Sequence, residues 1–288
     1  MSAIREAIQP SSGSTARRIS SAISGQSVIA RYAYFPKMSR EELYSHVAVE
    51  ADKYIPFNIK DVILDCQILE EKKEEEKMYA LLIAAKKEVV NYHLTLLQSV
   101  GLEVDFLDVD TFAVINAFEH FLGSQTSLAY HALLDVGAKA TNLCILRGAT
   151  TLFSRNIPIG GTDFTQAISE KSSLETEAAE VLKCSGNKPP EELLAMVGPP
   201  LENLVSEIKL SFDYFENQYD KRVEKIYLSG GSSRLPGLLP YVQKNLNIES
   251  LSWDPFAGMT ISSNQSQKLR SVRESLTTAV GLALRSSL

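Results

Sequence analysis

The chain has 288 residues, of which 44% are hydrophobic and 22% charged, and its formal net charge is −6. This charge disfavours nucleic acid as a partner, since binding to a phosphate backbone needs an excess of Lys and Arg on one face. Cys66, Cys144 and Cys184 share no ligand spacing, which indicates reduced thiols rather than a metal site or a disulfide framework. No apolar run has the length of a signal peptide or a membrane span, so we expect a cytoplasmic protein that reaches a membrane only through partners.

The beginning of the chain is polar and rich in serine. A short helix is predicted over Ala16–Ile23, and alternation of apolar and polar residues predicts a strand over Ser27–Tyr34. Ser39 and Glu42 have the spacing of a capping box, so they predict the start of a helix that continues to Pro56.

A compact α+β unit is predicted to include this helix and the residues that follow it. Its strands are expected at Val62–Leu69 and Met78–Ala85. A helix is expected over Glu88–Val100, where Gly101 suits a left-handed C-cap, and a strand over Glu103–Val109.

The rest of the chain alternates short strands with helices, which is typical of an α/β fold. Asp110 predicts the start of one helix. The expected strands are Ala132–Val136, Thr141–Arg147, Thr151–Pro158 and Lys225–Leu228. The other expected helices begin near Thr162 and span Leu174–Cys184, Pro199–Tyr219, Leu235–Leu246 and Ser271–Leu284.

The segment Leu133–Leu143, which reads LLDVGAKATNL, places a glycine turn directly after an apolar strand. Asp135 and Thr141 could hold a hydrated Mg²⁺ against phosphates that the N–H groups of Gly137 and Ala138 bind. The same residues also fit an ordinary hairpin, in which Asp135 caps the turn and Gly137 supplies a positive φ. Taken alone, the motif favours the ordinary hairpin.

A second turn of this kind lies in Tyr227–Leu238, which reads YLSGGSSRLPGL. Gly230 and Gly231 would let the main chain pass close under a purine or ribose, and the start of the following helix favours an anion. A structural turn from strand to helix fits these residues equally well. Taken together, the two turns predict a nucleotide cleft between two lobes, and we expect them to form its opposite walls.

Glu180 and Lys183 lie three residues apart, on one face of a predicted helix, and by themselves indicate a surface ion pair. The four histidines have no ligand spacing, and no Ser-His-Asp or Cys-His arrangement is evident. These patterns therefore leave the catalytic residues unknown.

The order of these motifs resembles the superfamily of actin, sugar kinases and chaperone ATPases. The motifs that carry the resemblance are D-x-G-x-x-x-T at Asp135–Thr141, R-x-I-x-x-G-G at Arg155–Gly161, E-x-x-K at Glu180–Lys183 and L-S-G-G-S-S-R-L-P-G at Leu228–Gly237. Within the superfamily, Arg155–Asp163 and Tyr54–Val62 are most similar to the PilM-like family of type IV pilus assembly proteins. The FtsA-like cell-division proteins are less similar.

The resemblance implies an actin-like, ribonuclease H-like α/β fold of two lobes, with an inserted α+β subdomain of the SHS2 type and an incomplete first lobe. It implies a first-lobe remnant at 1–38, the inserted peptide-binding subdomain at 39–109, a returning helix at 110–131 and the second lobe at 132–288, with an insertion at about 172–222.

The resemblance also implies ATP and Mg²⁺ as cofactors, with Mg²⁺ held through water by Asp135. Glu180 and Lys183 become the expected contacts to ribose or base. The full set of implied nucleotide-binding residues is Asp135, Gly137, Ala138, Thr141, Gly160, Gly161, Glu180, Lys183, Gly230, Gly231, Ser232 and Arg234.

Relatives of this kind begin with a D-x-G-x-x-x-x-K loop that binds the β- and γ-phosphates, and this sequence starts downstream of such a loop. The first hypothesis is therefore an adaptor that binds the cytoplasmic N-terminal tail of a PilN-like inner-membrane protein, with impaired ATP binding. The alternatives are an active ATPase, an FtsA-like protein and, more distantly, a sugar kinase with Asp110 as its one weak candidate base. The resemblance also allows contacts with other pilus platform and motor proteins, and self-association.

Overall fold

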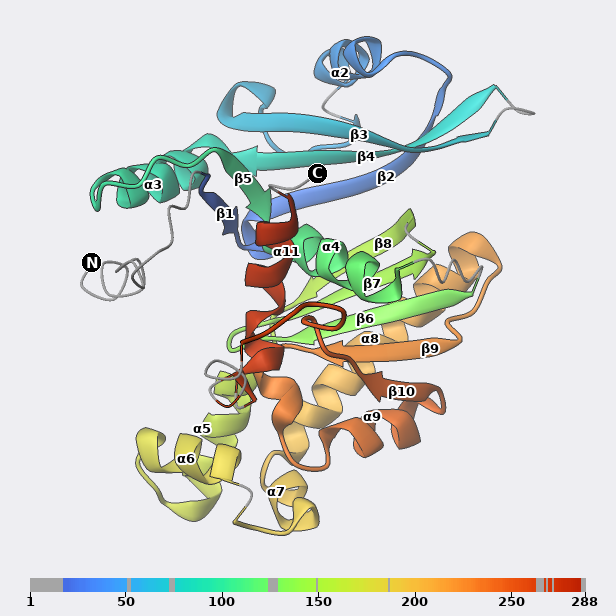
Figure 1. Ribbon diagram of the computed structural model, residues 1–288. Helices are drawn as coiled ribbons and strands as arrows, with labels where there is room; N and C mark the ends of the chain where they lie inside the picture. Colours follow the sequence, from blue (N-terminus) through green and yellow to red (C-terminus); the bar gives the residue numbers. More distant parts are fainter. Residues whose placement is uncertain are drawn as a thin grey trace. The chain divides into compact units, whose positions relative to one another are not determined.

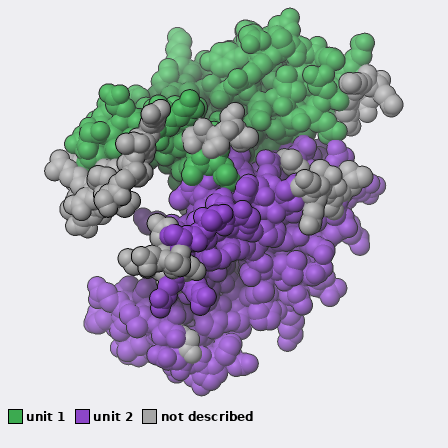
Figure 2. Space-filling model, viewed as in Figure 1, with its two compact units in different colours: residues 1–113, 282–288 green, residues 114–281 purple. Residues whose placement is uncertain are grey.

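The computed structural model describes residues 18–285 except 51–52, 73–75, 124–128, 149, 186, 263–266, 268 and 271. The chain divides into two compact units: unit 1 consists of residues 1–113 and 282–288, and unit 2 of residues 114–281 (Figure 2). Helices α4 (Asp110–Leu122) and α11 (Thr277–Arg285) each contribute residues to both units. No helix in the described part of the chain combines the length and apolarity needed to cross a bilayer.

Unit 1 is built on an antiparallel sheet with the strand order β2-β4-β3 (Figure 1). Its strands are β2 (Val28–Pro36), β3 (Val62–Lys72) and β4 (Lys77–Lys86). Helix α2 (Arg40–Val49) covers one face, because its Leu43 and Val47 lie one turn apart and are both fully buried in the core of this sheet. Other members of that core are Phe35, Leu64, Cys66, Met78, Ala80, Leu82 and Ala84.

A second cluster in unit 1 joins the parallel strands β1 (Ser20–Ile23) and β5 (Phe106–Val109) to helix α3 (Lys87–Gln98). Val90 of α3 packs there with Ile23 and Val109. Short 3₁₀ turns occur at Gly25–Ser27 and Ile59–Asp61.

An ion pair connects the end of α11 to β5. Arg285 Nη1 donates to Asp108 Oδ2 at 2.8 Å, and Asp108 is buried. Burial raises the pKa of Asp108, although the Val109 N–H and Arg285 both act against that shift. The last turn of α11 is therefore part of the structure of unit 1.

Unit 2 contains a five-stranded sheet with the order β10-β9-β6-β7-β8 (Figure 1). Strands β6 (Tyr130–Val136), β7 (Thr141–Arg147) and β8 (Thr150–Ile157) form an antiparallel meander. Strand β9 (Lys225–Ser229) pairs in parallel with β6, and β10 (Glu249–Ser252) pairs in parallel with β9. The helices of this unit are α5 (Gly161–Ser172), α6 (Thr176–Ser185), α7 (Pro190–Met196), α8 (Gly198–Tyr219) and α9 (Leu238–Leu246), with 3₁₀ turns η4 (Gly231–Arg234) and η5 (Arg273–Leu276).

Both faces of this sheet are covered by helices. The ring of Phe118 on α4 lies 4.8 Å from that of Tyr227 on β9, and the ring of Phe215 on α8 lies 5.8 Å from that of Tyr130 on β6. Tyr227 pairs with Leu133, three positions from Tyr130, so the two tyrosines point to opposite faces. Burial on both faces explains the apolar runs Ala132–Leu134 in β6 and Leu143–Leu146 in β7.

Some elements differ from the sequence-based prediction. Ser20–Ile23, predicted as helix, forms strand β1 because β5 provides a pairing partner, and residues 16 and 17 lie outside the described residues. The helix predicted to continue to Pro56 ends at Val49. Helix α7 and strand β10 have no counterpart in the prediction. Strand β2 precedes the predicted boundary at residue 39 yet pairs along its whole length with β4, so the sheet of unit 1 includes residues on both sides of that boundary.

Candidate functional site

The two predicted glycine turns are neighbours at the C-terminal ends of the adjacent parallel strands β6 and β9. Asp135 is paired with Ser229, and Ser229 Oγ donates to Asp135 Oδ1 at 2.9 Å. The expectation that the turns form opposite walls of a cleft between lobes is wrong, because both belong to unit 2 and pack directly against each other. In open α/β sheets, ligands bind just beyond the carboxyl ends of the strands.

The glycine at position 230 is required by this close packing. Gly230 has φ +86°, and a Cβ there would lie 2.7 Å from the backbone nitrogen of Val136. At Gly137 a Cβ would lie 2.8 Å from the carbonyl oxygen of Ala140, which accepts the Gly137 N–H at 2.9 Å. The positive φ therefore occurs at Gly230 and not at Gly137, where the hairpin interpretation placed it.

The start of α5 binds the first turn. The Gly161 N–H donates to the carbonyl oxygen of Gly137 at 2.9 Å, and the Thr162 N–H donates to that of Ala138 at 2.7 Å. The Gly160 N–H donates to Asp163 Oδ2 at 2.8 Å. The first N–H groups of this helix, which elsewhere could bind an anion, are thus used to hold the turn of residues 137–140.

Asp135 and Thr141 are both buried but have different surroundings. Thr141 Oγ1 donates to the carbonyl oxygen of Ile159 at 2.8 Å, so its hydroxyl proton is used to fix the segment before α5. Asp135 supplies a single carboxylate, and the described residues contain no group of three potential metal-ligating side chains. A Mg²⁺ ion that keeps most of its waters and takes its other ligands from phosphates fits such a site.

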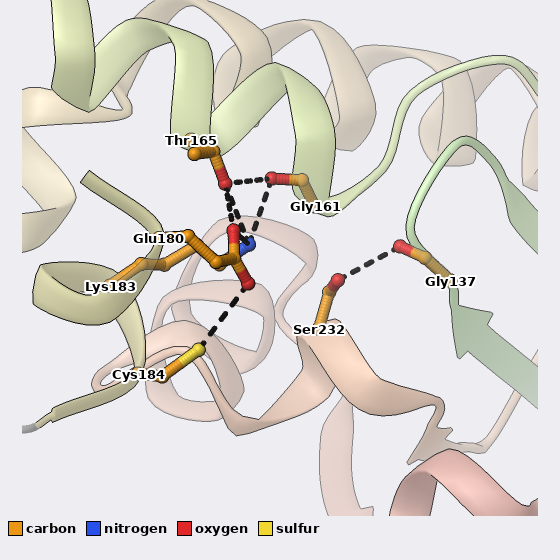
Figure 3. Close-up of polar contacts among 7 residues, drawn as sticks. All are labelled: Gly137, Gly161, Thr165, Glu180, Lys183, Cys184 and Ser232. Carbon is orange, nitrogen blue, oxygen red and sulfur yellow. Dashed lines mark hydrogen bonds and ion pairs between the residues drawn. The ribbon is translucent and has the colours of Figure 1, made fainter. Parts of the chain in front are cut away.

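Glu180 and Lys183 form the ion pair that their spacing predicts, but Lys183 is buried and the pair belongs to a larger network with Thr165 and Gly161 (Figure 3). Lys183 is 6% exposed, and its ammonium donates to Glu180 Oε2 at 2.6 Å, to Thr165 Oγ1 at 2.8 Å and to the carbonyl oxygen of Gly161 at 3.0 Å. Thr165 and Glu180 are also hydrogen-bonded to each other. The network ties α6 to the first turn of α5.

The Glu180 carboxylate is half exposed, which makes it the accessible member of this network. Burial opposes its ionisation, but the hydrogen bonds from Lys183 and Thr165 and the charge of Lys183 outweigh that effect and hold the pKa of Glu180 below its ordinary value. Cys184 Sγ donates to Glu180 Oε1 at 3.5 Å, and burial together with the carboxylate charge raises the pKa of this thiol. Both effects disfavour the thiolate form of Cys184 at neutral pH.

The second turn is also bound by the segment around Glu274, which no sequence motif singled out. The Gly230 N–H donates to the carbonyl oxygen of Glu274 at 3.1 Å, and a Cβ on Gly231 would lie 2.9 Å from Ser275 Oγ. Arg234 Nε lies 3.8 Å from Glu274 Oε2. No residue pattern near 274 signals this contact, because it exists only through the packing of η5 on η4.

The predicted residues therefore gather beyond the C-terminal ends of strands β6 and β9. Ser232 Oγ completes the set by donating to the carbonyl oxygen of Gly137 at 2.9 Å (Figure 3). Arg234 is at the margin, with 45% of its side chain exposed. Direct contacts link Gly137, Ala138, Gly160, Gly161, Glu180, Lys183 and Ser232, together with Thr162 and Thr165, which the sequence did not single out. The other predicted residues contact members outside this set: Asp135 contacts Ser229, Thr141 contacts Ile159, Gly230 approaches Val136, and Gly231 approaches Ser275.

Comparison with known proteins identifies the family. The model of the family "Type IV pilus assembly protein PilM" matches residues 1–287. A solved structure of a PilM–PilN type IV pilus biogenesis complex contains a chain that is 31% identical, with 96% of this chain and 81% of that chain covered and a TM-score of 0.85. A structure of MreB5 of Spiroplasma citri bound to ADP is similar in fold alone, with 11% identity, coverage of 70% and 66% and a TM-score of 0.50. The fold is mixed α/β and actin-like, and the chain belongs to the PilM family of type IV pilus assembly proteins.

Proposed function

We propose that this protein is a scaffold of type IV pilus assembly that binds the N-terminal tail of a PilN-like inner-membrane protein. The observation that carries the proposal is the similarity to the chain in the PilM–PilN complex, which extends over 96% of this protein. A function in recruiting a membrane protein also agrees with the sequence, which has neither a catalytic constellation nor a charge suited to nucleic acid. The protein would then reach the inner membrane through this partner.

The binding of a synthetic peptide tests this function. A synthetic peptide with the sequence of the N-terminal tail of a PilN-like protein is titrated into the full chain by isothermal calorimetry, with a scrambled peptide as the control. Saturable binding of the native peptide alone is expected. Equal binding of both peptides, or of neither, would remove the adaptor function.

Unit 1 is the proposed location of the peptide, since it offers two edge strands, β2 and β3, to an extended chain. On β2, Tyr34 is 49% exposed and its ring lies 4.9 Å from that of Tyr79 on β4. These rings are on the face opposite the α2 core. Tyr79 itself is buried, so the half-exposed ring of Tyr34 is the aromatic group that a peptide pairing with β2 could contact.

Two tyrosine variants test the location. Tyr34→Ala is expected to lower the peptide affinity at least tenfold, whereas Tyr92→Ala, which removes a 73% exposed ring on α3, is expected to leave it unchanged. If both variants bind the peptide as the parent does, the site lies away from β2 and the adaptor function stands.

Nucleotide binding at the edge formed by Asp135, Gly137 and Gly230 is the second candidate function. It is favoured by one observation: two glycine turns meet at the C-terminal ends of parallel strands, where α/β folds bind ligands. A bound nucleotide would supply the phosphates that complete the coordination of Mg²⁺, and Asp135 would hold that ion through water. Hydrolysis is no part of this proposal.

Equilibrium binding of a fluorescent ATP analogue with Mg²⁺ tests the second candidate. Asp135→Asn is expected to weaken the binding at least tenfold, because it removes the charge but keeps the shape of the side chain. Asp213→Asn, on the exposed face of α8, is the control. A parent protein that shows no saturable binding would contradict this candidate without affecting the adaptor function.

A further inference from the structure

Lys139 lies in the turn of residues 137–140, beyond the C-terminal ends of β6 and β9, and none of the sequence motifs assigns it a function. Its side chain is exposed. In the described part of the chain this side chain makes no hydrogen bond and no ion pair. Its ammonium group is therefore available to a ligand at the place where the two glycine turns meet.

The turn also directs two of its N–H groups away from the helix that holds it. The carbonyl oxygens of Gly137 and Ala138 accept N–H groups from the first turn of α5, at 2.9 and 2.7 Å. In a trans peptide unit the carbonyl and the N–H point in opposite directions, so the N–H groups of Ala138 and Lys139 point away from α5. Neither N–H group has a partner among the described residues. Successive N–H groups on one side of a turn form a concave site for an anion.

The charges near this turn give Lys139 a particular weight. Lys183 and Arg234 each lie beside a glutamate, with nitrogen–oxygen distances of 2.6 and 3.8 Å. Either cation can meet a ligand, but with its carboxylate neighbour neither adds net charge to the site. Asp135 adds a negative charge. A phosphate chain that Mg²⁺ only partly neutralises therefore needs a further positive charge, and Lys139 supplies it.

We propose that Lys139 is a further ligand-binding residue, which contacts the phosphate chain of a nucleotide through its N–H and its ammonium group. The proposal rests on the nucleotide binding that is the second candidate function. The N–H groups are fixed in the turn and select the position of a phosphate, whereas an ammonium group on a flexible four-carbon stem follows it as a point charge. The ligand class is therefore a polyphosphate chain, and the affinity depends on the charge at position 139.

Substitutions at position 139 separate charge from shape. Lys139→Met removes the charge and keeps the length of the side chain, and Lys139→Arg keeps the charge. Because the side chain is exposed and unpaired, neither change leaves a buried group without a partner, so we expect both variants to fold. Lys209→Met is the matched control, since Lys209 on α8 is also exposed and has no ion pair among the described residues.

Equilibrium binding of the fluorescent ATP analogue with Mg²⁺ to the full chain is the first measurement. Lys139→Met is expected to weaken binding about tenfold and to make the affinity fall less steeply with added salt, because one charge pair is lost. Lys139→Arg and Lys209→Met are expected to bind as the parent does. Unchanged affinity in Lys139→Met, or an equal loss in Lys139→Arg, would overturn the proposal.

Inorganic tripolyphosphate separates a failure of this proposal from a failure of the nucleotide site, because it carries phosphates without a base or ribose. If the parent binds the ATP analogue, the first measurement decides the role of Lys139. If the parent binds no analogue, the second candidate function is contradicted, and calorimetry with tripolyphosphate and Mg²⁺ decides instead. Binding that Lys139→Met loses would retain Lys139 as a phosphate-binding residue, whereas no binding, or equal binding in parent and variant, would overturn the proposal.

Discussion

At the scale of single residues, Gly230 follows β9 and packs against Val136 at the end of β6, a strand that lies far from it in the sequence. Its positive φ and its approach to Val136 are separate constraints, and the chain contains a residue that has only the first of them. Gly101 has φ +85°, and a Cβ there would meet no atom within 4 Å. Gly101 is therefore a matched control for the effect of close packing.

We predict that Gly230→Ala destabilises the protein more than Gly101→Ala does. Both changes place alanine at a positive φ, which costs about 1–3 kcal/mol. Only Gly230→Ala also forces a Cβ against the Val136 backbone. Urea unfolding of the two variants measures the difference in the free energy of unfolding. An equal decrease in both variants would show that β6 and the second turn are not closely packed.

The network of Glu180, Lys183 and Thr165 makes the stability of the protein depend on pH through Glu180. Because its pKa in the folded protein is lowered, its contribution is fully present above the ordinary glutamate pKa and is lost as the pH falls through the folded-state value. We predict that Glu180→Gln lowers the melting temperature at pH 7 and that this difference shrinks in the acid range. A difference that stays constant as the pH falls would mean that Glu180 is not the titrating group. Glu170→Gln, on the exposed face of α5, serves as the control.

The candidate site was only partly predictable at this scale. The two glycine motifs identify positions 135–141 and 228–237 because a turn directly after an apolar strand leaves a local signature. The burial of Lys183 leaves none, since E-x-x-K has the same spacing on an exposed helix. The sequence did not indicate Thr162, Thr165 or Glu274 for the same reason. Their hydrogen bonds to the site form between segments that only the packing of the fold brings together.

At the scale of elements, helix α2 shows what local chemistry can determine. Ser39 Oγ accepts the Glu42 N–H at 3.2 Å, and the Ser39 N–H donates to Glu42 Oε2 at 2.8 Å, which completes the capping box that the sequence predicts. The end of this helix at Val49 has no comparable signal. Strand β1 likewise could not be predicted, since its conformation depends on β5.

We predict that Ser39→Ala lowers the free energy of unfolding by about 1 kcal/mol, because it removes the side-chain acceptor at the start of α2. Ser45→Ala, in the same helix, removes a hydroxyl that donates only to the Glu41 carbonyl and is expected to be neutral or slightly stabilising. Urea denaturation of both variants checks this, and equal effects would contradict a capping role.

At the scale of the whole molecule, the family and the α/β class were evident from the sequence because they depend on the order of motifs along the chain. The boundaries of the units were harder to predict. A sheet can recruit a strand from either side of a helix in the sequence, as unit 1 does with β2, and hydrophobic patterning alone does not say which strand pairs with which. Hydrophobic patterns along the sequence predict where strands occur but not which strands are neighbours in the sheet.

The pairing of Asp108 with Arg285 has a consequence for how the protein is made. These residues are 177 positions apart, so during synthesis the carboxylate leaves the ribosome long before its guanidinium partner has been translated. The ion pair can therefore form only after the intervening polypeptide has emerged, although β5 can pair with β1 before then. Until Arg285 has been synthesised, the nascent chain carries an unpaired carboxylate at Asp108, a position that is buried in the folded protein.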